Sequence, residues 1–200
     1  MAASFLAKKH VWVGSSFSMD SEVPMLRVMM RGGLLEEGDF KKRRDAWYAR
    51  ATATESSPRS IPLWTLAFAD NLQTRAEATA AMAALPEGVA WSSALRLDQE
   101  SYARAQVGHA LLLAGQVQAG LGQLEGATLA CDWLRWPVHQ TQALLHLGQA
   151  HATLGHRESA CTAYQRVVDR WGTAATSATR DAARARLKVL GCGTPAAGAP

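Results

Sequence analysis

The sequence contains very little isoleucine and no long hydrophobic run. One isoleucine and 11 valines stand against 38 alanines and 23 leucines in 200 residues. Because β-branched residues favour strands while alanine and leucine favour helices, the composition excludes a strand-rich fold and predicts an all-α one. No apolar stretch approaches the length of about 20 residues that a transmembrane helix needs, so we expect no membrane partner.

Charge and cysteine are scarce as well. Charged residues make up 19% of the chain, and the net charge of +4 is too small to indicate nucleic-acid binding. The stretch after Lys8 and Lys9 is too short and polar for a secretion signal. Cys131, Cys161 and Cys192 form an odd set without a C-x-x-C motif. We therefore expect reduced, mostly buried thiols in a cytoplasmic protein.

The sequence lacks the motifs of enzymes and metal sites. It has no P-loop, dinucleotide fingerprint or nucleophile elbow. No two of its histidines stand three or four residues apart, the spacing that places two ligands on one helix face. They are His10, His109, His139, His146, His151 and His156. We predict a non-enzymatic chain with no catalytic residue, cofactor or metal, in which His151 packs rather than binds a ligand.

The first half of the chain shows several helical patterns. We expect helices over 23–30, 40–54, 61–72 and 75–85, with Asp39 and Thr74 as N-caps and Gly32-Gly33 after the first helix. The four side chains of the basic run from Lys41 to Arg44 point to all sides of the predicted helix. It favours a solvated surface, with contact to an acidic partner as the alternative.

The tryptophans divide into two groups. Trp47, Trp64 and Trp171 occupy apolar helical positions and are expected in the core. Trp133 and Trp136 lie just before Pro137 in an expected loop between repeats, where anchoring of the loop is favoured over an exposed patch for a partner.

The strongest pattern is a repeat with a spacing of 40 residues. Val107-Gly-His-Ala-Leu-Leu-Leu-Ala-Gly115 matches Leu147-Gly-Gln-Ala-His-Ala-Thr-Leu-Gly155. The pattern predicts a helix with a glycine at a close helix crossing, then a glycine in a left-handed turn. A second helix follows, with Gly120 or Ala160 at the crossing and Leu124 or Tyr164 closing the core. A weaker third copy lies upstream, at Trp64, Ala67, Phe68, Ala80 and Ala84.

These residues resemble the tetratricopeptide repeat, although the spacing exceeds the usual length of about 34 residues. The best matches are Leu144, Leu147-Gly148, His151, Gly155, Ala160 and Tyr164. The resemblance implies a superhelix of about three to four helical hairpins over 34–190, closed by a helix over 177–190. Residues 1–33 remain a poorly defined N-terminal segment, and 191–200 are expected to be a disordered tail.

A narrower resemblance covers about residues 35–192. Segments such as Ala-Cys-Thr-Ala-Tyr-Gln-Arg-Val-Val-Asp-Arg-Trp-Gly, and the ending at Cys192, look like the C-terminal repeat region of myxobacterial serine/threonine protein kinases. The kinase motifs themselves are absent. The resemblance implies a regulatory module of a kinase signalling system. The alternatives are a C-terminal fragment of a larger kinase, or a structural remnant without a partner.

In the tetratricopeptide family, the first helix of each hairpin lines a binding groove. Carried over to this chain, that resemblance implies a groove for a protein or peptide partner. Its predicted lining residues are Tyr102, Ala105, His109, Leu112, Gln142, Leu145, Gln149 and Thr153. The alternative is that these side chains pack against the neighbouring N-terminal part of the chain.

Overall fold

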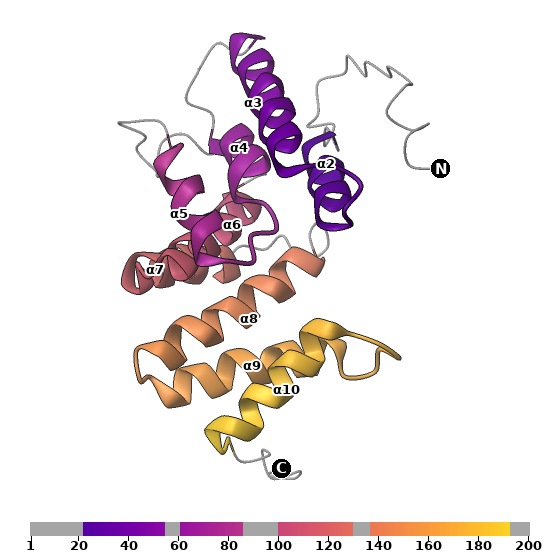
Figure 1. The fold of residues 1–200 in the computed structure, drawn as a ribbon. Helices are drawn as coiled ribbons and strands as arrows, with labels where there is room; N and C mark the ends of the chain where they lie inside the picture. The colour runs from indigo at the N-terminus through magenta and orange to yellow at the C-terminus, as the bar shows by residue number, and fades with distance from the viewer. Residues whose placement is uncertain (1–21, 55–60, 86–99, 130–136, 193–200) are drawn as a thin grey trace. The chain divides into compact units, whose positions relative to one another are not determined.

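The computed structural model describes residues 22–54, 61–85, 100–129 and 137–192 (Figure 1). All regular structure in these ranges is helical, which confirms the predicted all-α class. None of the helices described there is long and apolar enough to cross a membrane. The chain divides into two compact units, residues 1–70 and 71–200, and this division falls inside the single domain predicted over 34–190.

The first unit contains α2 (Glu22–Arg31), α3 (Glu37–Thr54), α4 (Ile61–Trp64) and the π-helix η1 (Thr65–Ala69). The predicted helices over 23–30 and 40–54 are confirmed. The second begins earlier than predicted, so Asp39 lies within its first turn instead of capping it. A continuous α-helix over 61–72 was a wrong prediction. The Asp70 amide donates to the Thr65 carbonyl oxygen at 2.8 Å, which closes a wider π-turn.

Aromatic rings and two arginines hold the first unit together. Trp47 and Trp64 are buried, as predicted. Arg27 is also buried, and its guanidinium donates to the carbonyl oxygen of Ala67 at 3.0 Å. The Arg44 guanidinium lies 4.5 Å from the centre of the Phe68 ring. The basic run is therefore only partly a solvated surface.

The second unit contains α5 to α10. Their bounds are α5 (Arg75–Ala83), α6 (Glu100–Ala114), α7 (Val117–Leu129), α8 (Pro137–Thr153), α9 (Arg157–Trp171) and α10 (Ala178–Leu190). Helices α6 and α7 form one hairpin, α8 and α9 form the next, and α10 packs on α9 (Figure 1). Thr74 caps α5 and Ser177 caps α10 through side-chain hydrogen bonds. The weaker third repeat copy has Trp64, Ala67 and Phe68 in the first unit and Ala80 and Ala84 in the second unit. The other two copies both lie within the second unit, where they form the two hairpins.

The two hairpins turn in the same way, 40 residues apart. Gly115 and Gly155 have φ angles of +89° and +77°, the left-handed conformation that their positions predicted. After each glycine, a backbone amide donates back into the helix at 2.9 Å, from Gln116 to Leu111 and from His156 to His151. The repeat read from the sequence is therefore a repeat of backbone structure.

The helix crossings are as close as the sequence indicated. A Cβ atom placed on Gly108 would lie 2.6 Å from Cγ of Leu124, and one on Gly148 would lie 2.5 Å from Cε1 of Tyr164. On the opposite side of the first crossing, a Cβ on Gly120 would lie 2.9 Å from the carbonyl oxygen of Gly108. These distances leave no room for a larger side chain, so small residues set the spacing within both hairpins.

Candidate functional site

The predicted groove residues lie on α6 and α8, the first helices of the two hairpins, which pack against each other. The structure buries Tyr102, Ala105 and Leu145. It leaves the remaining positions partly or fully exposed, and these are His109, Leu112, Gln142, Gln149 and Thr153. The face is thus less open than predicted, because the two first helices use part of it for contact with each other.

Two ring contacts join α6 to α8 along this face. Tyr102 meets His139 edge to face, with ring centroids 4.9 Å apart. Seven residues further along each helix, His109 stacks on His146 at 3.7 Å with an interplanar angle of 11°. Nδ1 of His146 also lies 3.0 Å from the side-chain oxygen of Gln149. The contacts fix the relative position of the hairpins and direct Gln149 towards the histidine pair.

Burial lowers the pKa of both stacked histidines. The pKa of His109 falls to about 3, first through loss of hydration and then through repulsion by His146. The pKa of His146 is also lowered by burial, although its hydrogen bond to Gln149 acts in the opposite direction. Both rings are therefore neutral at physiological pH, and the stack is compatible with a neutral core contact.

This burial predicts a loss of stability in mild acid. Below pH 6.5 the unfolded chain binds a proton at His109, whereas the folded chain keeps this ring neutral until about pH 3. Lowering the pH from 7.5 to 5.0 should therefore reduce the free energy of unfolding by about 2 kcal/mol through His109 alone. Urea unfolding at several pH values measures this slope. His109→Phe, which keeps a ring in the stack, should flatten it, and an equal slope in the variant would contradict the assignment.

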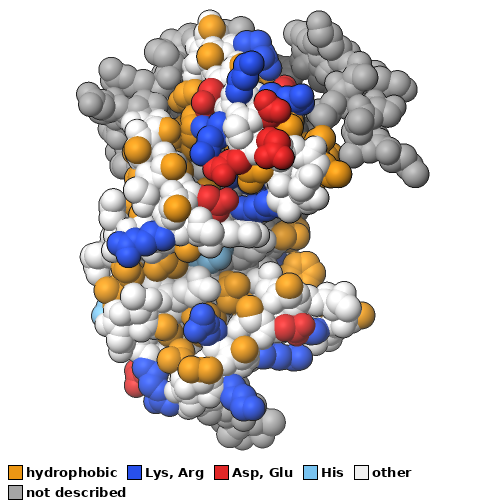
Figure 2. Space-filling model, viewed as in Figure 1, with side chains coloured by type: hydrophobic (Ala, Val, Ile, Leu, Met, Phe, Trp, Pro, Cys, Tyr) orange, Lys and Arg blue, Asp and Glu red, His pale blue; other side chains and the backbone are white. Residues whose placement is uncertain are grey.

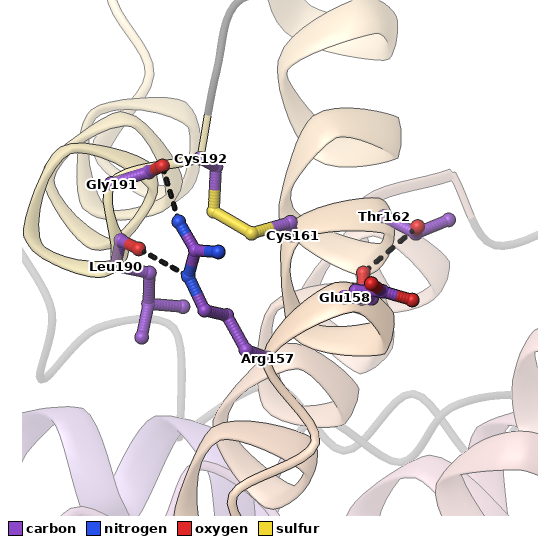
Figure 3. Close-up of a disulfide and its surroundings, with 7 residues drawn as sticks. All are labelled: Arg157, Glu158, Cys161, Thr162, Leu190, Gly191 and Cys192. Atoms are coloured by element: carbon purple, nitrogen blue, oxygen red, sulfur yellow. Dashed lines mark hydrogen bonds between the residues drawn. A yellow bond between two sulfur atoms is a disulfide. The ribbon is translucent and has the colours of Figure 1, made fainter.

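A disulfide joins α9 to Cys192, the second residue after the end of α10 (Figure 3). Cys161 and Cys192 are bonded, with their Cα atoms 5.7 Å apart. The expectation of reduced thiols was therefore wrong for these two residues. The pairing arises because α10 folds back along α9 and brings together cysteines that are 31 residues apart in the sequence.

Arg157 strengthens the same connection. Its guanidinium donates to the carbonyl oxygens of Leu190 at 2.7 Å and Gly191 at 2.6 Å, at the C-terminal end of α10 (Figure 3). A positive charge at this end is favoured by the helix dipole and satisfies carbonyl groups that lack partners within the helix. Gly191 and Cys192, predicted as part of a disordered tail, are thus held against α9.

The disulfide borders an open hollow of about 320 Å³, which is also lined by Thr162, Gln165, Arg166, Asp169 and Leu187. The lining itself holds one basic and one acidic residue, Arg166 and Asp169. Residues 137–192 carry seven arginines and lysines against three acidic residues. Figure 2 shows blue side chains outnumbering red ones at this end of the second unit. Because the hollow is open, the disulfide is within reach of small dissolved reductants.

His151 and His156 form a second histidine pair, which sequence spacing did not reveal. Nδ1 of His151 lies 3.5 Å from Nδ1 of His156 across the α8–α9 turn. His151 is partly exposed instead of packing in the core as predicted, because it occupies the last turn of α8 beyond the helix crossing. Its pKa is lowered chiefly by partial burial, with Glu125 acting in the opposite direction.

The remaining residues singled out in the sequence are either outside the core or outside the described residues. Trp171 is half-buried at the end of α9 and is not a core residue. Cys131, Trp133, Trp136 and His10 lie outside the described residues, as do residues 193–200. Within the described part of the chain, no three histidine, cysteine, aspartate or glutamate side chains gather as metal ligands.

Comparison with protein-family models, with curated proteins and with solved structures gives no match for this chain. The resemblances to tetratricopeptide repeats and to kinase C-terminal regions therefore rest on the residues themselves.

Proposed function

We propose that the chain is a tetratricopeptide-like, non-catalytic scaffold that binds a peptide segment of a partner protein on the α6–α8 face. The observation that supports this most is the repeated construction of the two hairpins, which share turn geometry and glycine crossings at a spacing of 40 residues. Stacked hairpins of this kind present their first helices side by side, and such rows commonly serve as binding surfaces.

The chemistry of this face suits a peptide. Leu112 offers partly exposed apolar surface, while Gln142 and Gln149 carry amide groups that can both donate and accept hydrogen bonds. The face has no arginine or lysine among its predicted lining residues, so recognition of a terminal carboxylate by a charged clamp is not part of the proposal. An extended or helical segment with alternating apolar and polar residues would fit it.

We also propose that the scaffold works with a serine/threonine kinase, as the narrower resemblance implies. The structure gives packing roles to residues that carry this resemblance, since Tyr164 covers Gly148 and Cys192 bonds to Cys161. The alternative, a fragment of a larger kinase, is decided by the DNA upstream of the Met1 codon. An in-frame kinase domain there would support the fragment, and a promoter with a ribosome-binding site would remove it.

The predicted cytoplasmic location now has a weaker basis. It rested on reduced cysteines, whereas stable disulfides are typical of oxidising compartments. Alkylation of the chain in intact cells, followed by mass spectrometry, separates the two cases. Blocked thiols at Cys161 and Cys192 would support the cytoplasm, and an intact disulfide would support an oxidising compartment.

Selection from a peptide-display library tests the proposed function. We expect the purified chain to enrich a recurrent peptide motif over an empty support. Gln142→Lys on α8 should weaken binding of that peptide, whereas the matched change Gln118→Lys, at an exposed position of α7, should not. Failure to enrich any motif, or equal binding by the two variants, would contradict the proposal.

A further inference from the structure

The α8–α9 turn holds two imidazole rings in a defined arrangement. His151 lies in the last turn of α8, and His156 is the N-cap residue of α9. The backbone amide of His156 donates to the carbonyl oxygen of His151 at 2.9 Å, and Gly155 between them adopts a φ angle of +77°. The backbone therefore places the two residues close together on either side of the turn.

The contact between the rings is made by nitrogen atoms of the same kind. The two Nδ1 atoms are 3.5 Å apart, and the ring centroids are separated by 5.7 Å. The distance of 3.5 Å between the two Nδ1 atoms is longer than the usual hydrogen-bond range of about 2.7–3.2 Å, so a proton shared between these nitrogens would be held weakly. When neither Nδ1 atom carries a proton, each has a lone pair directed at the other ring. The two lone pairs can then bind a cation larger than a proton.

We propose that His151 and His156 bind a divalent transition-metal ion of the zinc, nickel or copper class. At Zn–N distances of about 2.0–2.1 Å, two nitrogens 3.5 Å apart subtend an angle of about 113–122° at the metal, close to tetrahedral. Neutral imidazole nitrogens suit this class of ions, whereas calcium and magnesium prefer oxygen ligands. The pair therefore supplies two ligands with little rearrangement.

The surroundings fit an open site. His156 is exposed and His151 is partly exposed, so water molecules can occupy the remaining coordination positions. Glu125 on α7 interacts electrostatically with His151, and its negative charge would favour a bound cation. The neighbouring Arg157 directs its guanidinium to the end of α10, where it bonds two carbonyl oxygens. A metal here would connect the last turn of α8 to the first turn of α9.

Calorimetric titration with zinc chloride at pH 7.5, using the full chain without reductant, tests this proposal. We expect one binding event in the wild-type chain. His151→Gln and His156→Gln should each weaken it by about tenfold or more, since even the partners of metal ligands contribute about that much. The double variant should lose little beyond either single one. His139→Gln, on the first turn of α8, is the matched control and should bind zinc as the wild type does.

Nitrogen-15 spectra of the imidazole rings provide a second readout that needs no variant. Addition of zinc should shift the Nδ1 resonances of His151 and His156 and leave those of His109 and His146 in place. Unshifted Nδ1 resonances in the wild-type chain, or zinc binding that survives both single substitutions, would overturn the proposal.

Discussion

Replacing Gly148 with valine should destabilise the chain more than any other single substitution discussed here. The new Cβ would lie 2.5 Å from Cε1 and 2.7 Å from Cδ1 of Tyr164, whose side chain is fully buried. Overpacking of this kind costs about 1–3 kcal/mol when neighbours can shift, and we expect about 3 kcal/mol or more because the ring has nowhere to move. Urea unfolding followed by circular dichroism measures the loss.

Gly122→Ala is the control for this prediction, because a Cβ there would meet nothing within 4 Å. Alanine is the better helix former by about 1 kcal/mol, so this change should stabilise the chain. A double variant with Tyr164→Ala should relieve part of the Gly148→Val cost, since the two residues are in contact. Equal stability of Gly148→Val and the wild type would contradict the assigned helix crossing.

Loss of the disulfide should have an effect of similar size. The bond closes a loop of 31 residues between Cys161 and Cys192, and the chain-entropy relation assigns about 3–4 kcal/mol to a loop of that size. We expect Cys161→Ser/Cys192→Ser to lower the unfolding free energy accordingly, with the earliest loss of hydrogen-exchange protection in α10. Hydrogen exchange resolved by mass spectrometry measures both effects.

A reductant provides the matched comparison. Tris(2-carboxyethyl)phosphine should lower the melting temperature of the wild-type chain, since the bond borders an open hollow. It should leave the double serine variant unchanged. A wild-type chain whose melting temperature does not respond to complete reduction would show that Arg157 and the packing of α10 hold this end without the bond.

The repeat made the second unit largely predictable. Gly108, Gly115, Gly148 and Gly155 indicated both hairpins because a close crossing and a left-handed turn are local demands on residue size. The disulfide was missed because it depends on α10 folding back on α9, which residue spacing does not show. The π-turn at Thr65 was missed because the apolar spacing of Trp64, Ala67 and Phe68 is that of an ordinary helix.

The candidate site was predicted less well. The helices that carry the site were assigned correctly. Tyr102 and Leu145 are buried, however, and the ring of His109 is partly covered by the stacked ring of His146. That stacking joins residues 37 apart, whereas the repeat aligns residues 40 apart. A repeat spacing identifies equivalent positions in two hairpins. It does not identify which positions of neighbouring helices touch.

Binding at the α6–α8 face is the central claim, and amide chemical-shift mapping tests it most directly. A peptide obtained by display selection would be titrated into the nitrogen-15-labelled chain. We expect the largest shifts in α6 and α8, around Leu112, Gln142 and Gln149. Shifts confined to α7, α9 or α10 would contradict the claim.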